Sequence, residues 1–274
     1  MAIRIGTSGF SFLDWKGTVY PREIKTAEML GYYANELKFN TVEINFTYYA
    51  LPSEKSFMSM QKKVPKDFIF TVKGNRGTTH DPFDPRIIPK PSIMKAYEVT
   101  KKFAAALKPL IEENQLGCVL LQFPFFFRPG EESREYLLKC RDLLKDIPLV
   151  IEFRSTEWAN PETLQFLSGN KLGFCAVDEP KLTRLMPYLP EVTAKTGYLR
   201  FHGRNNNWFN ASLEERYNYL YSEEELRAFI PDIKKMAGRA RDLYMFFNNC
   251  HLGFAAKNAD NLRKLLMELF PDQI

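Results

Sequence analysis

The chain has 274 residues, with 38 Lys and Arg against 33 Asp and Glu, which gives a formal charge of +5 at neutral pH. Hydrophobic residues make up 45% of the chain and charged residues 26%, which excludes a disordered, collagen-like or wholly coiled-coil protein. The weak positive charge permits an anionic partner, but without a block of Lys and Arg it does not by itself indicate nucleic acid.

Apolar strand patterns alternate with amphipathic helical patterns along the whole chain. Strands are predicted at residues 3–8, 41–46, 68–73, 118–123, 149–154, 174–178, 198–202 and 243–248. Helices are predicted at residues 26–38, 54–63, 93–114, 133–145, 161–167, 223–240 and 256–270. Asn160 precedes Pro161 as a helix N-cap would, and Ser222 and Glu225 have the spacing of a capping box.

Eight strands separated by helices predict an α/β fold, a TIM-type (β/α)8 barrel that forms one domain over residues 1–274. An open, doubly wound parallel sheet is the alternative. It is disfavoured because the turn at residues 6–9, Gly-Thr-Ser-Gly, matches neither a dinucleotide-binding nor a phosphate-binding glycine pattern.

The cysteine spacing and the first residues of the chain indicate the cellular compartment in which the protein is expected. The four cysteines, at positions 118, 140, 175 and 250, include no pair with the spacing of a thiolate zinc site. The chain enters a predicted strand at once, without the pattern of a signal peptide, and no apolar run reaches the roughly 18 residues of a membrane span. We therefore expect a cytoplasmic protein that does not contact membranes.

Polar residues break the apolar pattern at the carboxyl ends of the predicted strands, mostly with a period of two. Because side chains alternate along a strand, each such pair is expected to point into the barrel, at the end where TIM-barrel active sites are built. A structural ion-pair network that plugs the barrel is the alternative. The residues are Glu43, Asn45, Lys73, Gln122, Glu152, Arg154, Asp178, Arg200, His202, Asn248 and Asn249.

These residue types predict acid–base chemistry on an anion. Glu152, Asp178, His202 and Lys73 are the candidate catalytic residues, since carboxylates, imidazole and amine transfer protons. Arginines bind phosphate or carboxylate, so the candidate substrate-binding residues include Arg154, Arg200 and Arg204. The other candidate substrate-binding residues are Glu43, Asn45, Gln122, Trp208, Asn248 and Asn249.

No cofactor is expected. The chain has three histidines and no HExxH motif, which argues against a zinc site. A single divalent ion held by Glu43, Glu152 and Asp178 is the alternative, because Mg²⁺ or Mn²⁺ needs only a few carboxylates and water.

Two long connections, at residues 74–91 and 203–221, are candidates for loops that cover the mouth of the barrel. The second carries Trp208 among several asparagines, a composition typical of a substrate lid. The run Phe-Pro-Phe-Phe-Phe at residues 123–127 is expected to be largely buried beneath neighbouring loops.

Several motifs in order resemble the YecE-like family, a domain of unknown function, nearly from end to end of the chain. The resemblance implies a TIM-type barrel and no established reaction. The family usually has histidine directly after the EFR motif, where this chain has Ser155, which would alter a member in which that histidine is catalytic. The matching stretches are GTSGFSFLDWKGTVYP at 6–21, VEINFTYYALP at 42–52, FTVKGNRGTTH at 70–80, LLQFP at 120–124, EFR…W at 152–158, VDEP at 177–180, FHGR at 201–204 and FFNNCHLGFAAKNA at 246–259.

Three functions are compatible with these features. The favoured one is an enzyme, whether hydrolase, lyase or isomerase, that acts on a small substrate bearing phosphate or carboxylate. A nucleic-acid-binding protein or metal-assisted endonuclease is the second, with Trp208 or Phe209 stacking on a base. A non-catalytic ligand sensor or scaffold is the third. The oligomeric state is left open by the sequence.

Overall fold

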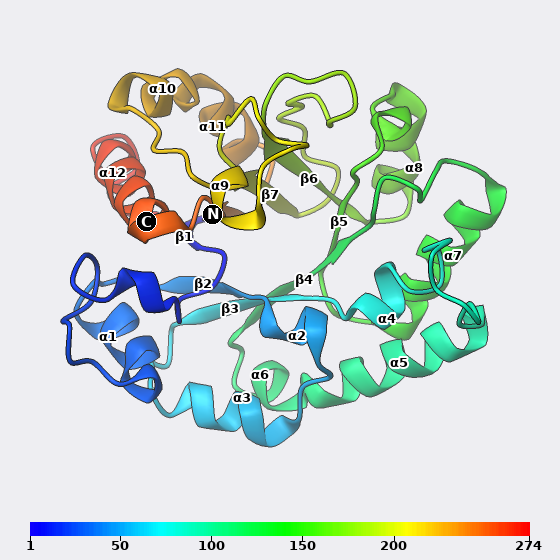
Figure 1. Ribbon diagram of the computed structural model, residues 1–274, viewed down its shortest axis with the longest axis horizontal. Helices are drawn as coiled ribbons and strands as arrows, with labels where there is room; N and C mark the ends of the chain where they lie inside the picture. Colours follow the sequence, from blue (N-terminus) through cyan, green and yellow to red (C-terminus); the bar gives the residue numbers. More distant parts are fainter.

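Eight parallel strands form one sheet that curves into a nearly closed barrel (Figure 1). The computed structural model describes residues 1–274, apart from the side chains of residues 213 and 214. The order of the strands in the sheet is β1-β8-β7-β6-β5-β4-β3-β2, as a TIM-type barrel requires. The strands are β1 (Ala2–Thr7), β2 (Thr41–Ile44), β3 (Ile69–Lys73), β4 (Leu116–Gln122), β5 (Leu149–Glu152), β6 (Gly173–Asp178), β7 (Thr196–Phe201) and β8 (Asp242–Phe247).

Helices surround the barrel (Figure 1). The α-helices are α1 (Met29–Asn35), α2 (Phe46–Tyr49), α3 (Glu54–Gln61), α4 (Arg76–Thr79), α5 (Ile93–Ala106), α6 (Lys108–Glu112), α7 (Glu131–Leu143), α8 (Pro161–Gly169), α9 (Leu213–Arg216), α10 (Glu223–Ala228), α11 (Ile230–Ala237) and α12 (Phe254–Met267). Short 3-10 turns are η1 (Leu13–Trp15), η2 (Thr26–Glu28), η3 (Thr156–Trp158) and η4 (His251–Gly253). None of the helices so described combines the length and apolarity that crossing a lipid bilayer requires.

Two helices predicted as continuous are each divided in two, because proline has no amide hydrogen to donate within a helix. The segment 93–114 is divided into α5 and α6, with Pro109 in the first turn of α6. The segment 223–240 is divided into α10 and α11, with Pro231 in the first turn of α11. The predicted caps are confirmed: Asn160 accepts a 2.8 Å hydrogen bond from the amide of Thr163, and Ser222 and Glu225 form a capping box.

The barrel closes between β1 and β2 without a regular ladder. One isolated bridge joins Ser8 to Glu43, and farther back the hydroxyl of Tyr33 from α1 enters the seam. That hydroxyl accepts a 3.0 Å hydrogen bond from the amide of Thr7 and donates a 3.1 Å bond to the carbonyl of Thr41. Gly6 permits this approach, since a Cβ atom there would lie 2.4 Å from the Thr41 carbonyl oxygen.

Aromatic rings fill the interior of the barrel below its polar end. The ring of Tyr198 lies 5.4 Å from Phe246 and 6.2 Å from Tyr244, measured between centroids, and all three residues are buried. The barrel is therefore packed, as TIM barrels are, and its polar end rests on an aromatic layer.

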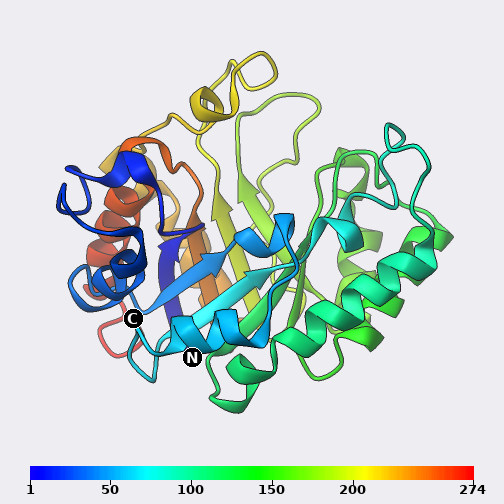
Figure 2. The ribbon, with the colours of Figure 1, turned by 60° about the horizontal axis from the view of Figure 1, so that its bottom comes forward.

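The carboxyl ends of the strands face the loops that position the candidate site. Figure 2 shows the arrows of β6 and β7 pointing toward the end where the segment with α9 projects. The two chain termini lie close together at the other end of the barrel (Figure 2). There the amide of Ile3 donates a 2.7 Å hydrogen bond to the carbonyl of Gln273. Of the predicted buried aromatic run, Phe123 and Phe127 are buried, whereas Phe125 is 63% exposed.

Candidate functional site at the carboxyl end of the barrel

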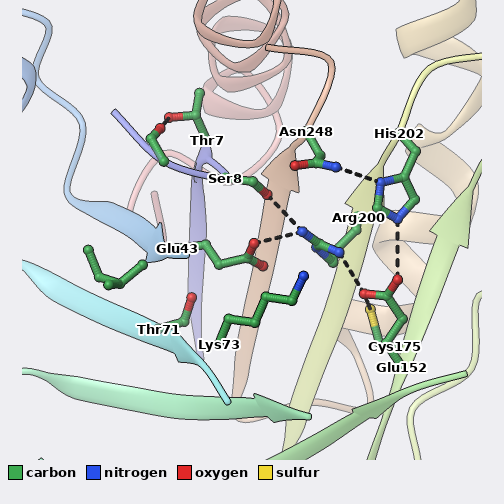
Figure 3. A network of polar contacts seen from close by, with 12 residues as sticks. Thr7, Ser8, Glu43, Thr71, Lys73, Glu152, Cys175, Arg200, His202 and Asn248 are labelled. Carbon is green, nitrogen blue, oxygen red and sulfur yellow. Dashed lines mark hydrogen bonds and ion pairs between the residues drawn. The ribbon is translucent and has the colours of Figure 1, made fainter. Parts of the chain in front are cut away.

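A guanidinium group bridges two carboxylates at the centre of the barrel mouth (Figure 3). Nη2 of Arg200 lies 2.7 Å from Oε1 of Glu43, and Nη1 lies 2.7 Å from Oε2 of Glu152. All three side chains are fully buried and come from β7, β2 and β5, at inward-facing positions. The other oxygen of Glu43 accepts a 2.6 Å hydrogen bond from Tyr198. Because each charge is paired, the cluster can be buried without isolated ions.

Arg154 links this buried cluster to solvent. Its Nη2 atom lies 2.8 Å from Oε1 of Glu152, and its Nη1 atom donates a 2.7 Å hydrogen bond to Glu179. The Arg154 side chain is 15% exposed, whereas that of Arg200 is 2% exposed. The next residue, Ser155, accepts a 3.4 Å hydrogen bond from the backbone amide of Glu157 and is the N-cap of η3.

The two arginines determine the protonation of Glu152. Burial alone would raise the pKa of this carboxyl, but the neighbouring guanidinium groups of Arg200 and Arg154 outweigh burial and hold its pKa well below the usual range. Burial raises the pKa of Glu179 despite its bond to Arg154. Two acidic side chains of the mouth thus differ in their readiness to accept a proton.

Lys73 extends from the end of β3 into the space between Glu43 and Glu152 (Figure 3). Its Nζ atom lies 4.7 Å from the centroid of the Tyr48 ring and makes no hydrogen bond or ion pair in the part of the chain described. Burial, together with the positive charge of Arg200, lowers the pKa of Lys73 to about 8. A lysine with such a pKa exchanges its proton near neutral pH.

His202 is an uncharged imidazole on the wall of the mouth. Burial and the charge of Arg154 lower its pKa to about 3. Its Nδ1 atom lies 3.0 Å from Nδ2 of Asn248, and its Nε2 atom lies 3.2 Å from Nη2 of Arg154. The Nε2 atom also lies 3.4 Å from Oε1 of Glu152, so the imidazole lies between the Arg154 guanidinium and the Glu152 carboxylate (Figure 3).

The segment 203–221 covers His202, and its two ends are fastened together. Trp208 is 5% exposed, with its ring 6.4 Å from that of His202. At the base of the segment, Arg204 donates to both oxygens of Asp178 at 2.8–3.1 Å, and Tyr221 donates to Asp178 at 2.6 Å. Asp178 and Arg204 therefore lie apart from the Glu43–Arg200–Glu152 cluster and form a clamp on the covering segment.

The remaining predicted residues divide between the mouth and the helix layer. Asn45 and Gln122 are half-buried at the ends of β2 and β4, and Oδ1 of Asn45 is buried without a hydrogen-bond partner among the described residues. Asn249 turns away from the mouth and donates 2.7 Å and 2.9 Å hydrogen bonds to the carbonyl of Tyr219 and the side chain of Asn258.

The three carboxylates considered as ligands of a divalent ion, those of Glu43, Glu152 and Asp178, do not converge on one point. Glu43 and Glu152 are bridged by Arg200, and Asp178 is paired with Arg204. Within the described residues, no group of three or more His, Cys, Asp or Glu side chains has a metal-binding arrangement.

Sequence reasoning missed three contributors to the mouth. Ser8 lies 3.3 Å from Nη2 of Arg200, and Tyr198 binds Glu43. Tyr198 precedes Arg200 by two residues, so the same alternation that identified Arg200 could have identified Tyr198. Tyr48, beneath Lys73, follows β2 in the short helix α2 and carries no such signal.

The sequence of the chain matches a protein family and a member of a related group. The family described as "Protein of unknown function DUF72" matches residues 4–272. The UPF0759 protein YunF of Bacillus subtilis is 30% identical over an aligned length of 281, and the alignment covers 96% of this chain and 94% of that protein.

Solved structures agree with the barrel. A DUF72 family protein from Thermotoga maritima MSB8 is 45% identical with a TM-score of 0.87, covering 97% of this chain and 99% of that one. One from Enterococcus faecalis V583 is 30% identical with a TM-score of 0.81, covering 96% and 95%. A xylose isomerase-like TIM barrel protein from Mycobacterium smegmatis, solved with magnesium, is 13% identical with a TM-score of 0.51, covers 97% of each chain, and shows likeness of fold alone.

Proposed function

The chain belongs to the DUF72 family of proteins of unknown function, and we propose that it is an enzyme that binds a small anionic substrate at the carboxyl end of its barrel. Membership confirms the resemblance that the sequence motifs indicated. The observation that carries the proposal is Arg154, which joins the buried Glu43–Arg200–Glu152 cluster to solvent. A plug that only filled the barrel would need neither a partly exposed guanidinium nor an amine without a partner.

Arg154 and Lys73 are the cations that a substrate can reach. Arg154 presents a planar guanidinium suited to a carboxylate or phosphate, and Lys73 adds a second positive charge across the mouth. Arg200 has both terminal nitrogens bound to carboxylates, so in this proposal it positions Glu43 and Glu152 and does not bind substrate. Asn45, Gln122 and Asn248 supply neutral hydrogen-bonding groups at the rim.

Lys73 and Glu152 are the groups that this proposal assigns to proton transfer. Lys73, with its pKa lowered to about 8 by burial and Arg200, is available both as an acid and as a base at neutral pH. Glu152 stays ionised and stabilises positive charge that develops beside it. Neutral His202 orients Arg154, and Trp208 excludes water from that side of the mouth.

The proposal is tested by calorimetric titration of the intact protein with inorganic phosphate and with pyruvate, comparing Arg154→Met with Arg128→Met. Arg128 is a 59% exposed arginine after β4 that pairs with Glu157, so both substitutions remove one positive charge. We expect at least a tenfold loss of anion affinity in Arg154→Met and little change in Arg128→Met. Equal losses in the two variants, or retained affinity in Arg154→Met, would contradict the proposal.

A second candidate function, binding of single-stranded nucleic acid, is favoured by two aromatic rings that are exposed on loops after β4 and β7. Phe125 is 63% exposed and Phe209 54% exposed, as rings that stack on bases must be. The test is binding of a labelled oligonucleotide over a range of salt concentrations. Binding that falls steeply with salt, and whose affinity Phe125→Ala and Phe209→Ala both lower, supports this function, and no binding at low salt excludes it.

A further inference from the structure

The amine of Lys73 differs from every other cation at the floor of the mouth. Arg200 and Arg154 each contact two carboxylates at 2.7–2.8 Å. Nζ of Lys73 projects between Glu43 and Glu152 without a hydrogen bond to either, and packs on the Tyr48 ring at 4.7 Å (Figure 3). Lys73 is half-buried, so a ligand that enters the mouth can reach an amine that has no partner among the described residues.

The surroundings also increase the nucleophilicity of this amine. Burial and the charge of Arg200 lower the pKa of Lys73 to about 8, so about 10% of the amine is neutral at pH 7. For an ordinary lysine, with a pKa of about 10.4, the neutral fraction is about 0.04%. Desolvation beside other cations is how lysine nucleophiles are activated.

We propose that Lys73 forms an imine with the carbonyl carbon of a substrate that also carries a carboxylate or phosphate, an inference that rests on the proposed function. The nitrogen lone pair forms the new C–N bond while the carbonyl π pair moves to oxygen, which takes up a proton. The nitrogen loses one proton, and the carbinolamine oxygen takes up a second proton and leaves as water while the nitrogen lone pair forms the second C–N bond. The product is an imine that is protonated on nitrogen. One water is released and no oxidant or reductant is needed. Arg154 holds the anionic group.

Neighbouring groups suit the steps around this bond. Glu152, which stays ionised, stabilises a protonated imine nitrogen. His80, whose ring lies 5.0 Å from that of Tyr48, is kept uncharged, since burial and Lys73 lower its pKa to about 3. The thiol of Cys175 is the other nucleophile at the floor, but it is buried beside Glu152 and burial raises its pKa, which suppresses the thiolate.

The first test is reductive trapping on the full-length protein. The protein is incubated at pH 7 with sodium cyanoborohydride and, separately, pyruvate, dihydroxyacetone phosphate or neutral acetone, and adducts are mapped by peptide mass spectrometry. We expect one dominant adduct at Lys73, formed about 100-fold faster than at the exposed lysines Lys66 and Lys90. The pyruvate and dihydroxyacetone phosphate arms distinguish a carboxylate from a phosphate, and acetone should react at least tenfold more slowly.

Matched variants separate this proposal from the function on which it rests. Lys73→Arg should abolish the dominant adduct, Lys90→Arg should not, and Arg154→Met should remove the preference for anionic carbonyls. Adducts spread equally over the lysines, or none with either anion, overturn the imine. If calorimetry still shows anion binding that depends on Arg154, the proposed function stands while the imine falls; without such binding, both fall.

A second measurement needs no substrate and no variant. Competitive acetylation with trace acetic anhydride over a pH series gives the titration of each lysine in the wild-type protein. A midpoint near pH 8 at Lys73 supports the proposal, and a midpoint at the value of an ordinary lysine overturns it.

Discussion

The hydroxyl oxygen of Tyr33 lies 3.1 Å from the carbonyl oxygen of Thr41, in the seam where β1 and β2 share a single isolated bridge. A side chain of α1 therefore supplies hydrogen bonds that a strand ladder supplies elsewhere in the barrel.

Tyr33→Phe should reduce the free energy of unfolding by about 1–3 kcal/mol, because it leaves the Thr7 amide and the Thr41 carbonyl without this partner. Urea denaturation measures the change. Tyr32→Phe is the matched control on the same helix, at a half-buried ring, and should cost less than about 0.5 kcal/mol. Equal costs for the two variants would mean that the Tyr33 hydroxyl does not join the strands.

Arg200→Met should destabilise the fold by about 3–5 kcal/mol, since Glu43 and Glu152 would be left buried without their shared cation. Arg227→Met removes the same charge from an exposed pair with Glu223 and should cost less than about 1 kcal/mol. Adding Glu43→Gln to the Arg200→Met protein should recover part of the loss. If it instead adds its full separate cost, the residues are not coupled.

The stability of the protein should fall as the pH is lowered from about 6.5 toward 3, in part through His202. Burial and Arg154 lower the folded-state pKa of His202 to about 3, whereas the unfolded chain binds this proton near the ordinary value of about 6.5. Above pH 6.5 neither state is protonated, and below it only the unfolded state gains the proton. Each pH unit in this window therefore costs about 1.4 kcal/mol.

Urea unfolding at pH 7 and pH 5 measures this term. The wild-type protein should lose about 2 kcal/mol more between these pH values than His202→Asn does. Identical losses would show that the pKa of His202 in the folded protein equals its value in the unfolded chain.

Trp208→Ala should loosen the segment that covers His202 and leave the sheet intact. Trp208 contacts His202, Tyr217 and Arg216, all on the mouth side. Hydrogen exchange followed by mass spectrometry should show faster exchange over residues 203–221, with unchanged protection of β5 to β8. Phe209→Ala, at an exposed neighbouring ring, is the control and should leave the exchange of this segment unchanged. Faster exchange throughout the sheet would instead make Trp208 part of the core.

The strand pattern predicted the architecture because each strand is short, largely apolar and buried on both faces. Few folds other than parallel α/β folds have strands of this kind. Helix ends were harder to predict. The segments 93–114 and 223–240 have one continuous amphipathic pattern, and only Pro109 and Pro231 mark where the backbone hydrogen bonding is interrupted. Tyr33 could not be recognised as the residue that closes the barrel, because its partners lie 26 and 8 residues away in sequence.

The alternation of side chains along a strand predicted contacts in the site only for strands that carry two polar residues. Glu152 with Arg154 and Arg200 with His202 meet in the mouth, as their spacing indicated. Asp178 and Asn249 end their strands on the opposite parity and contact the covering segment and the helix layer. A polar residue at the end of a strand thus shows at which end of the barrel it lies. Whether its side chain points into the barrel or outward depends on whether it is an even number of residues from an inward-facing residue such as Cys175.

The bridge that Arg200 makes between Glu43 and Glu152 also constrains how the protein is made. The three residues lie in strands two, five and seven, so both carboxylates are synthesised well before their cation. Until the seventh strand is available, burying Glu43 inside a partial barrel would isolate a negative charge from water, whereas Glu152 already has Arg154 as a partner. A nascent chain that ends before residue 200 should therefore keep Glu43 in contact with water, and the barrel closes only after Arg200 is present and β8 has paired between β7 and β1.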